Sequence, residues 1–515
     1  MKGWIRRAVW AVFAAWNLFL LFVILGRKDI EPTEVQNNVV IKQEKIKEVK
    51  LESFESESKK ATYNFSENAT LNNITLKNYK EKVDSSKLEK IQNKSYVIWE
   101  GNTQVPDKYT VWNKTIENNL VNFSWKNKDG VIFKQSWKID DNYGISLNIF
   151  VQNPSEKRIK VKADFIMQKE SIDDSQSFIF AGVSALLNDK LTEISASSLK
   201  ENIISGNNGW VSFNEKYWLN AVASNNFKRI EVSKDVKANK DFKIKAQENT
   251  FDLESMESKS TDFSLYFGPK KVQDMNIFSK NYNINRLDES IDYGWLFFLT
   301  KPVNAFLNFL IEKFSSVAIA LIALTLILKG VSWPLTASSQ RSMKKMQKVG
   351  PEINAIKERL KGNQALISQE IFALYKREKI NPISGCLPMV LQILLLFPLY
   401  KVLSFSIELR FAPFLFWVKD LSAADPTSWT NLFGILPWNA LEFLQVGAWP
   451  FLMGISMFFQ QKLSSSMEQN PAMTYALPVF FTWMMSTMPA GVVIYWTITN
   501  VLSIIQAVMI NREAD

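Results

Sequence analysis

The side chain best placed to do chemistry in this sequence is Lys329, a cation inside an apolar segment. It lies in 317–337 (VAIALIALTLILKGVSWPLTA), which is otherwise uncharged and long enough to span a bilayer. A charged side chain at the bilayer centre costs about 2.5–3.5 kcal/mol on insertion scales, so such a lysine predicts a polar environment and a function. The alternative is snorkelling, in which the long stem lifts the ammonium to the interface. Because eight residues of the segment follow Lys329, we favour a wet cavity.

The residue types that most enzymes use are missing from this chain. It contains no histidine, which excludes Ser-His-Asp triads, Cys-His pairs and histidine-ligated metals. Cys386 is the one cysteine, so no intrachain disulfide can form, and no CxxC, Walker-type or dinucleotide glycine motif is present. We therefore expect no catalytic residue, no metal and no cofactor.

The 515 residues fall into two unlike halves, a polar one up to about residue 290 and an apolar one after it. Near the start, the apolar run 8–25 follows the basic residues Lys2, Arg6 and Arg7. Eighteen residues of helix span about 27 Å, which is enough to cross a membrane. No small-x-small cleavage site follows the run. We expect a retained anchor over 1–26 rather than a cleaved signal peptide.

The polar half is expected to be a tether followed by an all-β sandwich. Residues 27–60 are rich in Lys, Glu, Gln, Asn and Ser, which predicts a flexible linker. From 61 to 290 short segments alternate apolar and polar residues, which is typical of strands. A hairpin is predicted where VNFSWKNKDG precedes VIFKQSWKID, with its turn at 127–130. Further strands are predicted at 145–152, 159–168, 210–213 and 263–267.

The apolar half predicts an interfacial helix followed by five membrane spans. The stretch 291–314 is aromatic with flanking charges, so we expect it to lie flat in the interface. The five spans, with the anchor, give six transmembrane helices, and the core extends over 315–510. They are expected at about 315–336, 385–407, 443–460, 473–488 and 491–510.

Loop charges orient these spans. Residues 338–382 hold ten Lys and Arg against four Glu, which predicts a cytoplasmic loop. A cytoplasmic N-terminus also makes the sandwich external and this loop internal, so the two signals agree. We expect a multi-pass protein of a bacterial inner membrane with a periplasmic sandwich. The tail 511–515 is expected in the cytoplasm.

The basic loop 338–382 is expected to form a cytoplasmic helical hairpin. Gly350-Pro351 interrupts its helical pattern and Gly362-Asn363 provides the turn. Exposed methionines such as Met343 and Met346 suit binding of varied apolar segments, although a solvated face around a small core is the plainer interpretation. The loop also carries the basic residues Lys344, Lys345 and Arg377. The apolar residues at helical spacing are Met343, Met346, Ile353, Ile356, Leu360, Leu366, Ile367, Ile371 and Leu374.

Six motifs, in order and without large gaps over 290–510, resemble the YidC family of membrane-protein insertases, whose relatives are the Oxa and Alb proteins. They are KGVSWPLT (329–336), MKKMQKVGPEINAIKERL, ISQEIFALYKREKINPISGCLPMVLQ (367–392), FAPFLFWVKDLSAADPTS (411–428), PFLMGISMFFQQKLS (450–464) and MPAGVVIYWTITNVLSIIQ (488–506). The anchor and sandwich, with GNNGWVSFNEKYWL (206–219), resemble the Gram-negative form of the family.

The resemblance implies a hydrophilic groove among the five core helices, open to the cytoplasm and the lipid. Lys329 matches the family's groove cation, which is usually arginine. Thr325 matches a position that contacts substrate, as do Tyr495 and Trp496. A positive groove would attract acidic residues in the external tail of a substrate, and no nucleotide would be needed.

Polar residues elsewhere in the spans could hydrate such a groove. Gln392 and Asn500 lie in otherwise apolar spans, and hydrogen bonding between helices is an equally good interpretation of both. Pro334 removes one backbone hydrogen bond and is expected to kink its helix.

The resemblance implies nascent membrane proteins, the Sec translocon and lipid as partners, and no sequence-specific nucleic acid. Residues 511–515 carry a net charge of −1, so contact with a ribosome or a signal-recognition receptor would use the hairpin. The alternative function is a secondary transporter with a buried cationic substrate site, but repeated halves and an intramembrane carboxylate are missing from the sequence. An enzyme built on the sandwich is a further alternative, disfavoured because the chain has no histidine.

Overall fold

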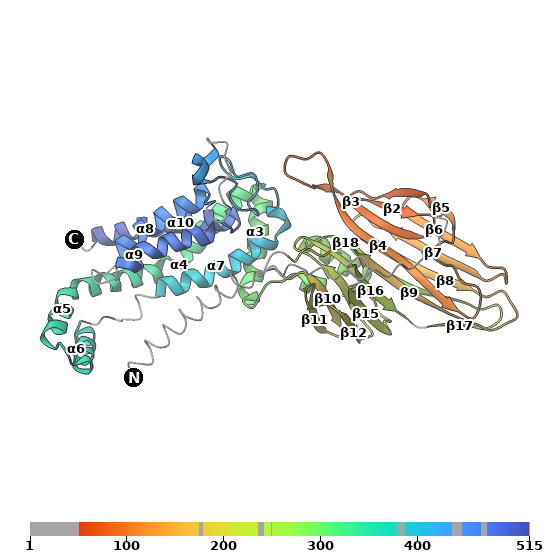
Figure 1. Cartoon of the computed structure of the whole chain (residues 1–515), viewed down its shortest axis with the longest axis horizontal. Helices are drawn as coiled ribbons and strands as arrows, with labels where there is room; N and C mark the ends of the chain where they lie inside the picture. Colours follow the sequence, from red (N-terminus) through yellow and green to blue (C-terminus); the bar gives the residue numbers. More distant parts are fainter. Residues whose placement is uncertain are drawn as a thin grey trace, which may run out of the picture.

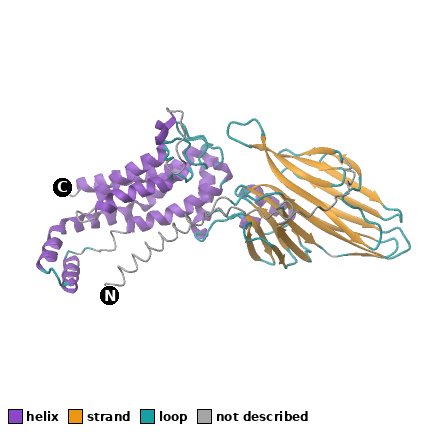
Figure 2. Ribbon diagram, viewed as in Figure 1, coloured by secondary structure: helices purple, strands orange, loops and turns teal. Residues whose placement is uncertain are grey.

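The structure is a computed structural model that describes residues 51–174, 179–234, 241–248, 250–378, 380, 387–434, 445–464 and 471–513. Its polar half forms a β-sandwich and its apolar half forms a bundle of helices beside it (Figures 1 and 2). The predicted anchor over 1–26 lies outside the described residues.

Two antiparallel sheets make up the sandwich. The first runs in the order β1 (Ser53–Glu57), β2 (Ala61–Ser66), β3 (Thr70–Lys80), β4 (Leu88–Gly101), β9 (Ile159–Lys169), β16 (Phe242–Gln247), β15 (Arg229–Lys234) and β12 (Glu201–Ile204), with β17 (Phe251–Leu253) also paired to β9. The second runs β11 (Lys190–Ser195), β10 (Gly182–Leu187), β13 (Gly209–Asn214), β14 (Trp218–Ser224), β18 (Ser258–Pro269), β8 (Gly144–Gln152), β7 (Ile132–Ile139), β6 (Leu120–Lys126) and β5 (Asn113–Glu117).

The predicted hairpin is confirmed as β6 paired with β7, and its turn is closed by a hydrogen bond from Gly130 N to Asn127 O. Alternate residues of β7 point into the core, among them Phe133 and Trp137, which are fully buried. The four other predicted strands correspond to β8, β9, β13 and β18. Period-two alternation therefore identified these six strands, whereas others that line the core, such as the fully buried β10, were not predicted.

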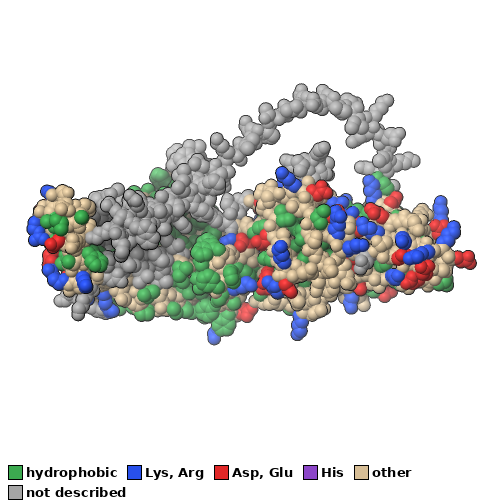
Figure 3. Space-filling model, turned by 90° about the horizontal axis from the view of Figure 1, so that it is seen from below, with side chains coloured by type: hydrophobic (Ala, Val, Ile, Leu, Met, Phe, Trp, Pro, Cys, Tyr) green, Lys and Arg blue, Asp and Glu red, His purple; other side chains and the backbone are tan. Residues whose placement is uncertain are grey.

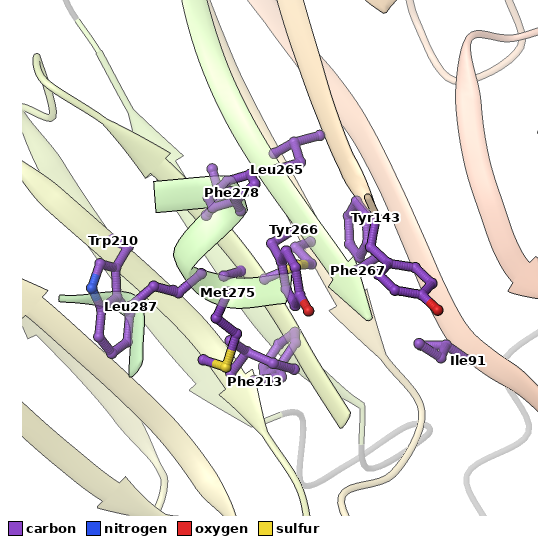
Figure 4. Packing of buried hydrophobic residues seen from close by; sticks show 14 of the residues in the cluster. Ile91, Tyr143, Trp210, Phe213, Leu265, Tyr266, Phe267, Met275, Phe278 and Leu287 are labelled. Atoms are coloured by element: carbon purple, nitrogen blue, oxygen red, sulfur yellow. The ribbon is translucent and has the colours of Figure 1, made fainter. Parts of the chain in front are cut away.

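Two details of the sandwich differ from the sequence prediction. β1 lies inside the predicted linker 27–60, because Phe54 stacks on Phe65 at 5.9 Å and ties the strand to the core. The domain is also not purely β. Helix α2 (Val272–Tyr282) follows β18, and the rings of its Phe278 and of Tyr266 in β18 lie 5.3 Å apart (Figure 4).

The bundle follows η1 (Leu287–Ser290) and begins with α3 (Phe297–Phe314), which contains Pro302 without ending there. Its other elements are α4 (Val317–Lys348), α5 (Gly350–Arg359), α6 (Gln364–Arg377), α7 (Leu387–Phe405), η3 (Ile407–Leu409), η4 (Trp429–Gly434), α8 (Ala448–Ser464), α9 (Pro471–Met485) and α10 (Ala490–Glu513). Among the described helices, α4 and α10 are long and apolar enough to cross a membrane, and shorter apolar helices lie at Leu394–Phe405 and Tyr475–Met485.

The sandwich is fastened to the bundle by ion pairs. Lys401, near the end of α7, lies 2.6 Å from Asp292, which follows η1. Arg410 lies 2.8 Å from Glu89 of β4, and its guanidinium is 5.3 Å from the ring centroid of Trp218 in β14. The loop between β3 and β4 reaches toward the bundle (Figure 1), where Asp84 meets Lys419 at 3.1 Å. These contacts join the loop after α7 to both sheets.

Candidate functional site

Polar residues form one stripe along α4. Thr325, Lys329 and Thr336 are spaced four and seven residues apart, so they share a face of the helix. All three are buried, with Lys329 only 8% exposed. The Thr325 hydroxyl donates to Leu321 O at 2.7 Å, which satisfies it within its own helix. The Lys329 side chain is thus almost completely covered by protein.

The ammonium of Lys329 meets a hydroxyl on α10. Its Nζ donates to Ser503 Oγ at 2.8 Å, and the Ser503 hydroxyl itself donates to Thr499 O at 2.8 Å. This second hydrogen bond leaves an oxygen lone pair of Ser503 facing the ammonium. Within the part of the chain that the structure describes, no carboxylate pairs with Lys329.

A second polar contact joins the same two helices two turns further along. Gln506 Oε1 lies 3.0 Å from Thr336 Oγ1, and Gln506 Nε2 donates to Trp333 O at 3.0 Å. Trp333 immediately precedes Pro334, which lies inside α4 without ending it. Gln506 thus contacts the backbone of α4 directly beside the proline. We call the set Lys329, Thr336, Ser503 and Gln506 the α4–α10 seam.

The other predicted residues of α10 face its neighbours in the bundle. Asn500 is fully buried and its Nδ2 donates to Ser456 Oγ on α8 at 3.1 Å. The ring of Trp496 makes an edge contact with Phe481 on α9 at 5.3 Å, and Tyr495 is buried in the core. Two buried polar atoms, Trp496 Nε1 and Asn500 Oδ1, have no hydrogen-bond partner among the described residues.

Gln392 is half-buried on α7. Among the described residues, no hydrogen bond joins its side chain to the α4–α10 seam.

The predicted hairpin is formed by α5 and α6 beyond the end of α4. Its small core contains Val349, Ile353, Leu374 and Ile380, with Met346, Ile356, Ile371 and Tyr375 packed against it. Met343 is half-buried, and Leu366 is exposed although it continues the helical pattern. Much of the predicted pattern therefore covers this core, as the plainer interpretation supposed.

The basic residues predicted for the hairpin differ in position and contacts, because Lys344 and Lys345 belong to the end of α4 and Arg377 to α6. Arg377 pairs with Glu352 at 2.7 Å and so links α6 to α5. Lys344 donates to Asn511 O, near the end of α10, at 2.9 Å, where a cation suits the negative end of the helix dipole. Lys345 is exposed.

Sequence reasoning missed three members of the seam: Thr336, Ser503 and Gln506. A signal for them exists, because Asn500, Ser503 and Gln506 recur every third residue in the last span. Polar residues at that spacing share a helix face and require a polar partner. Which partner they meet depends on the packing of α10 against α4, which the spacing does not reveal.

Known protein families match both halves of the chain. The family model described as "60Kd inner membrane protein" matches residues 309–515, and the one described as "YidC periplasmic domain" matches residues 42–306. A relative from Rickettsia africae, named "Membrane protein insertase YidC", is 34% identical over 79% of this chain and 76% of its own length. The relative of the same name from Rickettsia bellii is 35% identical over the same shares. The chain belongs to the YidC family.

Its sandwich is accordingly a YidC periplasmic domain, and its helical half is the inner-membrane part of a membrane-protein insertase. A crystal structure of an active YidC insertase covers 98% of this chain and 99% of its own chain, at 16% identity and a TM-score of 0.38. Membership of the YidC family rests on the sequence matches.

Proposed function

We propose that this chain inserts and helps fold inner-membrane proteins through a polar path along the α4–α10 seam, with Lys329 as the cation that receives the substrate. The observation that carries the proposal is a buried ammonium whose described partner is a neutral hydroxyl, Ser503 Oγ at 2.8 Å. The Lys329–Ser503 hydrogen bond joins the ammonium to a neutral oxygen, whereas a carboxylate would add the attraction of an opposite charge. An acidic side chain of a substrate would therefore compete well with Ser503 for the ammonium.

The path lowers the barrier for polar groups that must cross hydrocarbon. Each unsatisfied backbone group costs several kcal/mol in the dry core of a bilayer. Beside the seam, where α10 meets α8 and α9, Trp496 Nε1 and Asn500 Oδ1 have no partner among the described residues, and they offer a donor and an acceptor to water or to a substrate backbone. Thr325, Tyr495 and Gln392 complete the proposed contact set. Partition of the substrate's own apolar helix then completes the transfer.

We further propose six spans with both termini in the cytoplasm. The domain limits are an anchor over 1–26, a linker, the periplasmic sandwich up to 290, an interfacial helix over 291–314 and the core over 315–510. The excess of Lys and Arg in 338–382 supports a cytoplasmic hairpin. That hairpin would meet a ribosome or a signal-recognition receptor, and the chain would act alone or beside the Sec translocon.

The test is insertion by the purified chain in liposomes. A small substrate with an acidic external tail is added, and protease protection reports the fraction inserted by wild type, Lys329→Arg and Lys329→Ala. The proposal expects insertion by wild type and Lys329→Arg, and at least a tenfold loss for Lys329→Ala. Equal insertion by all three would remove Lys329 from the mechanism, while the family and the fold would stand.

A further inference from the structure

The loop between α7 and α8 exposes an uncharged apolar segment. Residues 411–418 (FAPFLFWV) contain no polar side chain apart from the Trp417 indole. Leu415 is 57% exposed and Phe416 is 82% exposed, more than any other large hydrophobic side chain among the described residues. Exposure of this much apolar surface to water is unfavourable, so we expect another molecule to cover the segment.

The backbone holds this exposure against its own preference. Phe411 and Phe416 adopt positive φ angles of 59° and 64°, a region that bulky residues rarely occupy. Such strain persists only where the surroundings impose it. The surrounding structure thus imposes a strained backbone that points an aromatic ring away from the protein.

The segment is held rigidly on the residues beneath it. Phe414 N donates to Val418 O at 2.9 Å, and the Phe414 ring lies 5.8 Å from that of Trp449 in α8. The Trp417 indole donates to Asp425 at 3.0 Å, so its polar atom points inward. Phe416 and Leu415 are therefore presented on a fixed base, which we call the loop tip.

The loop tip lies at the end of the bundle that faces the sandwich. Asp425, which holds Trp417, also accepts from the backbone N of Trp449 at the start of α8, at 2.8 Å. The residues just before α3 lie at this same end, since the Trp295 ring is 5.7 Å from Phe397 of α7, four residues before Lys401. Trp295, Phe297 and Phe298 are also exposed, and hydrophobic side chains gather beside the sandwich in Figure 3.

We propose that the loop tip inserts into the outer leaflet of the bilayer, at the boundary between headgroups and acyl chains. The seventeen residues of α8 span about 26 Å, less than the roughly 30 Å of a hydrocarbon core. The loop tip extends the apolar surface of α8 beyond Trp449 and so makes up the difference. The basic residues at its two ends, Arg410 and Lys419, are paired with Glu89 and Asp84, which leaves the tip itself uncharged.

Lipid explains the segment better than a protein partner does. The tip packs through Phe414 on Trp449 at the start of α8, where Phe451 and Leu452 are also exposed. Apolar and aromatic residues near the membrane interface are the usual anchors of membrane proteins. A protein partner would leave the tip in water whenever that partner is absent. In vesicles that contain only this chain, the tip is therefore buried in lipid if lipid is its occupant, and exposed to water if the occupant is a protein.

The test measures the depth of a spin label in proteoliposomes that contain only this chain. Cys386→Ser removes the natural thiol, and Phe416→Cys or Leu415→Cys is labelled in that background. The control is Met256→Cys on the sandwich turn before β18, because Met256 is 75% exposed and has a φ of 63°, almost the same as Phe416. Accessibility to oxygen and to an aqueous nickel chelate is then compared.

We expect the labels at 415 and 416 to be several-fold more accessible to oxygen than to the nickel chelate, and the label at 256 to show the reverse. Nickel accessibility at 415 and 416 equal to that at 256 would overturn the proposal and favour a protein partner. Insertion of substrate by the same vesicles shows that the labelled chains are folded. If the vesicles insert substrate while the labels at 415 and 416 are accessible to nickel, the lipid proposal fails and the proposed insertase mechanism stands.

Discussion

At the scale of single residues, the proposed mechanism depends on the environment of Lys329. Its position in an apolar stretch was evident from the sequence and predicted a polar surrounding. Its partner, Ser503, lies 174 residues away. Serine is common in membrane helices, so residue type alone could not identify it, and only the pairing of α4 with α10 does so.

Ser503→Ala is expected to lower stability without abolishing insertion. The substitution leaves a buried ammonium without its acceptor, which costs about 1–3 kcal/mol or more. A substrate carboxylate replaces that acceptor, so the inserted fraction should stay within about threefold of wild type. Thermal unfolding in detergent and protease protection measure the two effects. Thr497→Ala is the control, since that hydroxyl only donates to Val493 O in its own helix.

A buried carboxyl makes the periplasmic domain sensitive to pH. Burial raises the pKa of Glu248 to about 7, although Ser224 donates a hydrogen bond to it. The unfolded chain loses this proton near its ordinary pKa of 4.5 while the folded chain keeps it. Stability is therefore full below that value and falls as the pH rises through about 7, by up to about 3 kcal/mol.

Glu248→Gln removes the titrating group and should flatten this dependence. We expect the variant to be more stable than wild type at pH 8 and little different at pH 4.5. Thermal unfolding of both proteins across this range, followed by tryptophan fluorescence, measures the difference. An identical pH profile for the two would show that Glu248 does not titrate in the window.

At the scale of elements, sequence patterns predicted the type of each segment better than its limits. The span expected at 315–336 stops where apolar residues stop, but α4 continues to Lys348. A helix needs only its backbone hydrogen bonds to continue beyond the bilayer. β1 was missed because it buries a single residue of its five, which is too weak an alternation to detect.

Arg410→Ala is expected to loosen the joint between the sandwich and the bundle. The side chains of Arg410 and Glu89 are only 12% and 16% exposed, so removal of one partner leaves a charge buried and costs about 3–5 kcal/mol. Arg410→Lys should restore part of this loss, because lysine keeps the charge but lacks the planar group that lies over Trp218. Thermal unfolding in detergent ranks the three proteins.

The control for this joint is the exposed pair of Lys419 with Asp84. Its side chains are 67% and 77% exposed, so Lys419→Ala should cost less than about 1 kcal/mol. Equal losses for Lys419→Ala and Arg410→Ala would mean that burial does not distinguish the two pairs.

At the scale of the whole molecule, the order of the two halves followed from composition, but their attachment did not. The residues that join them are far apart in the chain, 321 positions for Arg410 and Glu89. Each is an ordinary charged residue in the sequence, and no local pattern marks it. The assembled molecule holds a periplasmic domain at one end of the bundle and the hairpin of α5 and α6 at the other (Figure 1).

The most direct test of the central claim is a charge cycle between Lys329 and the substrate. Wild type and Lys329→Ala are each given a substrate with an acidic external tail and the same substrate with a neutral tail, and the inserted fraction is measured by protease protection. We expect the acidic tail to raise insertion by about tenfold in wild type, a coupling of about 1.4 kcal/mol, and to have no effect in Lys329→Ala. The same advantage for the acidic tail in both proteins would contradict a direct role for the Lys329 ammonium.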